Sequence, residues 1–155
     1  MVTIGKQNDK RESKHMTNRE IYVPPTGPPR ENPFYPGFFS EFGEEKVRML
    51  FESFYDEIAI SSIRDMFPED LSESKVRTAD FLIQVMGGFP YYSQKYGPPK
   101  MRARHIPFEI DENARMVWLD CFAKAMEKNG VEDKHKEILW KFVVEFSKWM
   151  VNKKD

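Results

Sequence analysis

Three histidines and one cysteine are the side chains best suited to metal or nucleophilic chemistry, and one histidine has a distinctive setting. His105 lies in the string RARHIPF (residues 102–108), at the end of a short basic segment and two residues before a proline. A zinc site needs about four ligands, and no second histidine or cysteine lies near His105 in the sequence. Haem iron needs only one imidazole, because the porphyrin supplies four nitrogens. His105 is therefore a candidate haem ligand, although an isolated histidine is more often structural.

The other candidates favour structural interpretations. His15 lies in the N-terminal tail, and His135 stands among charged residues, which predicts a solvated position on a helix. Cys121 falls within an apolar helical stripe and is predicted to be inert packing. The sequence has no glycine-rich phosphate loop, no CxxC or HExxH motif, and no recognisable Ser-His-Asp set.

A haem needs a large apolar slot and cations near its propionates. Arg102 and Arg104 flank His105, and the chain has 13 phenylalanines and nine methionines to build such a slot. An exposed ion pair contributes only about 0–1 kcal/mol. Haem retention would therefore come mainly from the iron–imidazole bond and from apolar burial.

The apolar residues repeat at helical intervals and predict an all-α domain. The clearest stripe begins at Val47 and contains Val47, Leu50, Phe51, Phe54, Tyr55 and Ile58. Ser40 is a plausible cap before it, and residues 61–67 predict a further turn that ends at Pro68. The other predicted helices cover about 73–86, 111–128 and 132–151. A loop is predicted over 88–99. Val76 is predicted to face inward from the second helix. Asp111 begins the third helix, and Asn129-Gly130 ends it.

The first 36 residues differ from the rest because they hold six of the eleven prolines. We expect residues 1–20 to be mobile and residues 21–36 to be extended. Tyr22, Val23, Phe34 and Tyr35 are apolar enough to dock on a surface, but a solvated tail is the simpler interpretation. The prediction is an arm over residues 1–36 and one globular domain over residues 37–155.

Composition excludes several classes of protein. The 155 residues carry 24 Lys and Arg against 25 Asp and Glu, and a net charge of −1 argues against binding to nucleic acid or anionic membranes. No apolar run approaches the roughly 20 residues that span a bilayer. The first residues lack the apolar block of a secretion signal, and a single cysteine is typical of a cytoplasmic protein.

Residues 87–108, reading GGFPYYSQKYGPPKMRARHIPF, resemble the truncated haemoglobins, and group II most closely. The following segment 111–119 (DENARMVWL) is similar to that family's next helix, and residues 42–55 are similar to its first two helices. Trp118 lies 13 residues after His105, which adds to the specificity of the pattern. The resemblance covers about residues 38–150.

The resemblance implies a shortened globin in which two helices pack over two with haem b between them. His105 matches the proximal iron ligand, while Tyr55 and Trp118 match the distal tyrosine and tryptophan that stabilise bound ligand. Ser74 and Thr78 fall on ligand-facing helix positions. Arg77 and Arg104 match basic positions that contact propionates. With Arg102 and Phe108, which lie close to His105 in the sequence, the predicted cofactor contacts are Phe54, Phe67, Ser74, Arg77, Thr78, Arg102, Arg104, His105, Phe108 and Trp118.

The sequence also departs from the family pattern. The position of Phe67 is often Tyr or His in group II, and phenylalanine cannot donate a hydrogen bond. The interval from Tyr55 to Phe67 is one residue shorter than usual, and GGFP replaces the common GGP. The proline-rich arm is not a usual family feature. These differences concern the distal hydrogen bonds more than the haem site.

Without the resemblance, the positions of Tyr55 and Trp118 on apolar stripes are explained equally well by packing in the core. As distal donors, each would stabilise bound oxygen by about 1 kcal/mol, which together slows oxygen release roughly tenfold to a hundredfold. We therefore expect a globin that binds O2, NO and CO for redox chemistry or sensing rather than bulk transport. Nitric oxide dioxygenase or peroxidase-like activity would need a separate reductase, and the protein would be a monomer or homodimer. The alternative is a cofactor-free helical interaction module that binds partners through the arm.

Overall fold

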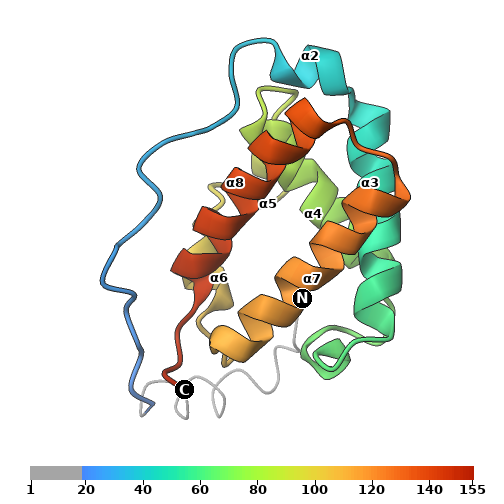
Figure 1. Ribbon diagram of the computed structural model, residues 1–155. Coiled ribbons are helices and arrows are strands. Elements are labelled where there is room, and N and C mark those ends of the chain that lie inside the picture. Colours follow the sequence, from blue (N-terminus) through green and yellow to red (C-terminus); the bar gives the residue numbers. More distant parts are fainter. Residues whose placement is uncertain (1–18) are drawn as a thin grey trace.

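The computed structural model describes residues 19–155, and its regular structure within that range is helical (Figure 1). Four long helices dominate, as the apolar stripes predict: α3 (Glu44–Ala59), α4 (Ser72–Val85), α7 (Glu112–Lys128) and α8 (Asp133–Met150). The short elements are α2 (Phe38–Phe42), η2 (Arg64–Met66), α5 (Tyr91–Tyr96) and α6 (Met101–His105). Within the described residues, no helix is long and apolar enough to cross a membrane.

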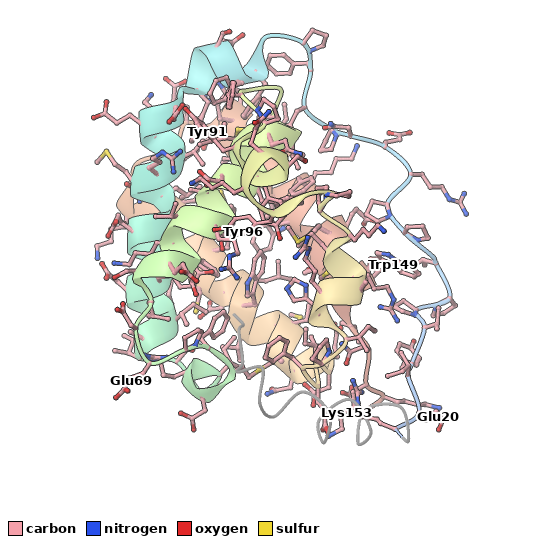
Figure 2. The ribbon with its side chains drawn as sticks, turned by 180° about the vertical axis from the view of Figure 1, so that it is seen from behind. Glu20, Glu69, Tyr91, Tyr96, Trp149 and Lys153 are labelled. Carbon is pink, nitrogen blue, oxygen red and sulfur yellow. The ribbon has the colours of Figure 1, made fainter. Side chains whose placement is uncertain are left out.

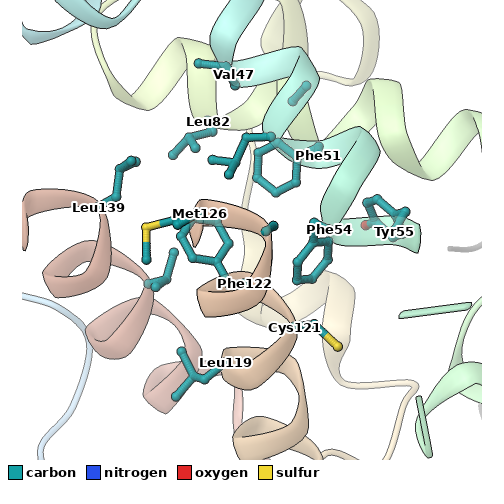
Figure 3. Packing of buried hydrophobic residues seen from close by; sticks show 14 of the residues in the cluster. Val47, Phe51, Phe54, Tyr55, Leu82, Leu119, Cys121, Phe122, Met126 and Leu139 are labelled. Atoms are coloured by element: carbon teal, nitrogen blue, oxygen red, sulfur yellow. The ribbon is translucent and has the colours of Figure 1, made fainter. Parts of the chain in front are cut away.

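Helix α3 is the central element, because it packs against both α4 and α7. Its predicted stripe is buried from Val47 to Ile58. Figure 3 shows Phe51 and Phe54 of α3 meeting Phe122 and Met126 of α7. Helix α8 packs on the other side of α7, so α3 and α4 lie over α7 and α8. This is the two-over-two arrangement that the resemblance implies.

Local sequence signals set several helix ends. The Asp111 carboxylate accepts a hydrogen bond from the Ala114 amide at 2.9 Å, which caps α7 as predicted. Gly130 has a φ of 61°, the left-handed conformation that glycine adopts readily after a helix. The predicted turn over residues 61–67 contains η2. Ser40, however, lies inside α2 and caps nothing, because α2 begins after Gly37.

The predicted loop over residues 88–99 is wrong in its middle, where α5 forms. Pro90 precedes the helix and Gly97 ends it with a φ of 80°. The side chain of Gln84 in α4 fastens α5 by donating to the Ser93 hydroxyl at 2.8 Å and accepting from the Ser93 amide at 2.9 Å. A tertiary contact therefore supports a helix that is too short to stand alone.

Two predictions about exposure are also wrong. His135 is buried, with its ring packed edge-on against Phe38 and Phe42 and its Nε2 3.3 Å from a carboxylate oxygen of Glu41. Val76, predicted to face inward, is 44% exposed.

The described part of the N-terminal arm, residues 19–36, has no helix or strand and runs along the face of α8 (Figure 1). Phe34 packs against Phe38 and against Phe142 of α8, with ring centroids 4.9 and 5.3 Å away. This part of the arm is docked rather than solvated, although Val23 is 59% exposed. The predicted mobility of residues 1–20 falls almost wholly outside the described residues.

Candidate functional site

A largely apolar cavity of about 350 Å³ lies between the helix pairs, within the usual size of a small-molecule site. It brings together all but two of the residues that the sequence predicts for a cofactor site. These residues are Tyr55, Phe67, Ser74, Arg77, Thr78, Arg104, His105, Phe108 and Trp118. Helices α3, α4 and α7 supply one part of the wall, and α6 with the loop after it supplies another.

His105, the last residue of α6, lines this cavity. Its Nδ1 lies 2.7 Å from the carbonyl oxygen of Met101, one helical turn earlier. A carbonyl can only accept, so Nδ1 carries the proton and donates it. Burial lowers the pKa of the imidazole and keeps the ring neutral. Nε2 is then the nitrogen with a lone pair, which is the state that a metal ligand requires.

Tyr55 and Thr78 form a polar pair in the wall built by α3 and α4. The Tyr55 hydroxyl and Thr78 Oγ1 lie 2.8 Å apart, and either can donate. Burial raises the pKa of Tyr55 to about 12, so the phenol stays protonated at physiological pH. The pair therefore always carries a hydroxyl proton that can be offered to a bound molecule.

Trp118 is positioned by aromatic packing. Its indole stacks on Phe122 at 5.9 Å with an interplanar angle of 8°, and its other neighbour is Phe54 at 5.2 Å. Phe54 is fully buried and does not line the cavity; it supports the rings of both Tyr55 and Trp118 from behind. Phe54 therefore supports the rings of Tyr55 and Trp118, and its position outside the cavity does not support the predicted contact with a cofactor.

Three arginines line the cavity, and the two that the sequence predicts, Arg77 and Arg104, do so in different ways. Arg77 donates from Nη2 to Glu73 at 2.8 Å and lies over the Tyr96 ring at 4.8 Å. Its Nε is buried and has no hydrogen-bond partner among the described residues. Arg104 donates to the carbonyl oxygens of Tyr96, Pro98 and Pro99, which fixes the loop before α6. An unpartnered buried donor on a cationic side chain is suited to an anionic group.

Arg102 does not belong to this site. It is absent from the lining of the cavity, and its guanidinium donates instead to the carbonyl oxygens of Tyr22, Trp149 and Val151. The guanidinium of Arg102 is therefore engaged away from the cavity, so its position does not support the predicted propionate contact. The carbonyls at the C-terminal end of α8 are favourable partners for this cation.

The sequence interpretation missed several lining residues. They are Ile63, Met66, Phe81, Tyr92, Met101, Ile110, Ala114, Arg115, Phe146, Ser147 and Met150. Phe146 and Met150 lie on the apolar stripe of α8, so periodicity could have placed them there. Arg115 is buried and donates from Nε to the Ser147 hydroxyl at 2.9 Å. Its helical spacing from Trp118, Leu119 and Phe122 was the available signal.

The donor set fits a haem and does not fit a metal held by protein side chains alone. Among residues 19–155, no three histidine, cysteine or acidic side chains gather as they would around a bare ion. The cavity instead offers one neutral imidazole, apolar walls and the orphaned donor of Arg77. A porphyrin supplies the missing four nitrogens, and its propionates supply acceptors.

Comparison with known proteins leads to the same class. The family model described as bacterial-like globin matches residues 38–152. The group 2 truncated haemoglobin YjbI of Bacillus subtilis is 35% identical over 115 residues, covering 74% of this chain and 87% of that protein.

Two solved structures agree with the fold. The group II truncated haemoglobin from Bacillus anthracis has a TM-score of 0.74 at 32% identity, covering 76% of this chain and 97% of that one. The truncated oxygen-avid haemoglobin from Bacillus subtilis has a TM-score of 0.72 at 35% identity, covering 74% and 98%. This chain therefore belongs to the bacterial-like globin family, within the group II truncated haemoglobins, whose members bind haem and diatomic gases.

Proposed function

We propose that His105 Nε2 is the protein ligand to the iron of a haem b held in the cavity. The observation that carries this proposal is the bond from His105 Nδ1 to the Met101 carbonyl, which leaves a neutral ring with its lone pair on Nε2. Such a haem supplies an iron centre that binds O2, NO and CO. The protein would supply the pocket, the histidine ligand and the polar groups around the cofactor.

The cationic side chains give the cofactor an orientation. The buried Nε of Arg77 needs an acceptor, and a haem propionate provides one. Arg104 lines the same cavity while its guanidinium holds the loop before α6. Phe67, Ser74 and Phe108 contribute contact surface around the ring.

The wall formed by Tyr55, Thr78 and Trp118 determines how long a gas ligand stays. The Tyr55 hydroxyl and the Trp118 indole N–H are two donors in an apolar surrounding, where each hydrogen bond to a polar diatomic contributes about 1 kcal/mol. Phe67 adds none. Slow release favours chemistry on the held ligand, or sensing, over bulk transport. The structural neighbour from Bacillus subtilis is an oxygen-avid haemoglobin, which also supports slow release of oxygen here.

The reactivity that suits such a pocket is nitric oxide dioxygenation or peroxide reduction. Either activity would draw electrons from a separate reductase. We place the protein in the cytoplasm, where a lone buried cysteine such as Cys121 stays reduced.

Haemin titration tests the proposal most simply. The full chain should take up one equivalent of haemin, and the reduced product should show an intense absorption band that shifts on addition of carbon monoxide. His105→Ala is the matched variant, and it should bind haemin much more weakly. A wild-type protein that takes up no haemin would contradict the proposal and favour the cofactor-free interaction module.

A further inference from the structure

The helix that carries His105 is too short to hold itself in place. Helix α6 has five residues, its preceding residue Lys100 adopts a φ of 42°, and no side chain caps its start. Isolated helices shorter than about 12–15 residues are marginal in water. The direction of the His105 ring must therefore be set by groups outside α6.

Arg102 makes the first of these connections, from α6 to the end of α8. Its Nη1 donates to the carbonyl oxygens of Trp149 and Val151, the latter at 2.9 Å, and its guanidinium lies 4.5 Å from the Trp149 ring centre. Its Nη2 donates to the carbonyl oxygen of Tyr22 in the arm at 2.8 Å. Figure 2, seen from behind, shows Trp149 on the side of the molecule along which the arm runs.

Asn152 makes the second connection and is fully buried. Its side-chain amide donates to the carbonyl oxygen of His105 itself at 3.1 Å. Its side-chain oxygen accepts a hydrogen bond from the backbone amide of Ile110 at 3.0 Å. The backbone amide of Asn152 donates to the backbone carbonyl of Ile110 at 2.9 Å. One buried side chain therefore fixes both the end of α6 and the segment that leads to α7.

Arg19 brings the arm to the same point. Its Nη2 donates to the carbonyl oxygen of Ile106 at 2.8 Å, and its Nη1 donates to the carbonyl oxygen of Asn152 at 3.1 Å. The Tyr22 amide donates to that same Asn152 oxygen at 3.0 Å. The arm thus bonds to the residue after His105 and to the residue that holds the His105 carbonyl.

We propose that Arg19, Arg102 and Asn152 form a latch that positions the His105 imidazole, so that the N-terminal arm tunes the iron–histidine bond. The proposal rests on the proposed role of His105 as iron ligand. The family match begins at residue 38, so the Arg19 component lies outside the region that the family shares. Arg19, Arg102 and Asn152 are positioning residues, since none of them lines the cavity.

The test uses the haem-loaded full chain and the variant Arg19→Met, with Arg30→Met as the control because Arg30 is an exposed arginine of the same arm. Resonance Raman of the reduced protein measures the iron–histidine stretching band, and transfer to an excess of apomyoglobin measures haem loss. Hydrogen exchange of the haem-loaded protein reports the amides of Ile106, Phe108 and Ile110.

We expect Arg19→Met to shift and broaden the iron–histidine band, to speed haem loss about tenfold, and to raise exchange at those amides. Arg30→Met should match the wild type in all three. Arg19→Lys keeps the charge but not the two-pronged guanidinium, so its values should fall between those of Arg19→Met and the wild type. This second variant also serves if Arg19→Met folds poorly by circular dichroism.

An Arg19→Met protein with an unchanged iron–histidine band overturns the latch, whether or not its haem is lost faster, because imidazole position is then independent of the arm. In that case the presence of the iron–histidine band in the wild type still supports His105 as the iron ligand. A wild type without any iron–histidine band overturns the role of His105 and the latch together, so the two failures can be told apart.

Discussion

The two walls of the cavity are held by different forces. The distal wall, meaning Tyr55, Thr78 and Trp118, stands on long helices whose inner faces form the aromatic core. The proximal wall, meaning α6 with His105, is one short helix tied by hydrogen bonds to chain segments at its outer side. Apolar packing therefore positions the proposed donors, whereas polar connections position His105, the proposed iron ligand. Changes in the core should disturb the whole fold, and changes in the connections should act locally.

The largest effect should come from Phe54→Ala. Phe54 is fully buried, does not line the cavity, and packs against the rings of both Tyr55 and Trp118. Its truncation should therefore lower the free energy of unfolding by about 3–5 kcal/mol. Urea unfolding at equal haem occupancy measures this loss. Phe89→Ala is the control, since Phe89 is 56% exposed and should cost less than about 1 kcal/mol. A loss as small for Phe54 as for Phe89 would show that the distal wall does not depend on the core.

The second prediction concerns the distal donors themselves. Tyr55→Phe and Trp118→Phe should each raise the oxygen dissociation rate about fivefold, because each removes one donor worth about 1 kcal/mol. Stopped-flow displacement of oxygen by carbon monoxide measures the rate. Phe67→Leu, which removes no donor, should change the rate much less. Unchanged rates in both single variants and in the double variant would disprove the assignment of these donors.

A smaller effect is expected for Arg77→Met. It removes the buried Nε that lacks a partner, so haem should dissociate a few-fold faster, in keeping with ion pairs of about 0–1 kcal/mol. The difference from wild type should shrink as salt is added, because salt screens the interaction. Lys128→Met, at the exposed end of α7, is the matched control. Equal haem loss in Arg77→Met and Lys128→Met would exclude the propionate contact.

The smallest effect at neutral pH concerns the ionisation of Tyr55. The folded protein holds its pKa at about 12, above the ordinary value of 10.0, so the neutral phenol contributes stability that is complete below pH 10. That stability is lost as pH rises from 10 towards 12. Unfolding experiments across this range should show a steeper loss in wild type than in Tyr55→Phe. Identical pH profiles would mean that the phenol is not held in an apolar site.

The helices that build the distal wall could be predicted because their apolar stripes are long. The stripe from Val47 to Ile58 predicted both α3 and its buried face. The resemblance of the segment around His105 to the family's iron-binding segment could likewise be seen in one short stretch of sequence. His135 could have been found too, since it precedes Leu139 by four residues and so shares the apolar face of α8, whatever its charged neighbours.

The proximal wall could not be predicted in the same way. The direction of Arg102 depends on the end of α8 lying beside α6, and no local pattern reports that contact. Helix α5 depends on Gln84, which belongs to another helix. Asn152 and Arg19 carry no periodic signal, and their partners are backbone carbonyls, which every residue type possesses. Polar connections between distant segments leave little trace in sequence, whereas apolar periodicity leaves much.

The most direct test of the central claim is the iron–histidine stretching band of the reduced protein, compared between wild type and His105→Gly. We predict a band in the wild type, its loss in His105→Gly, and its return when free imidazole is added to fill the space of the missing ring. A band that persists unchanged in His105→Gly without imidazole would contradict the assignment, because the iron would then be held by a different side chain.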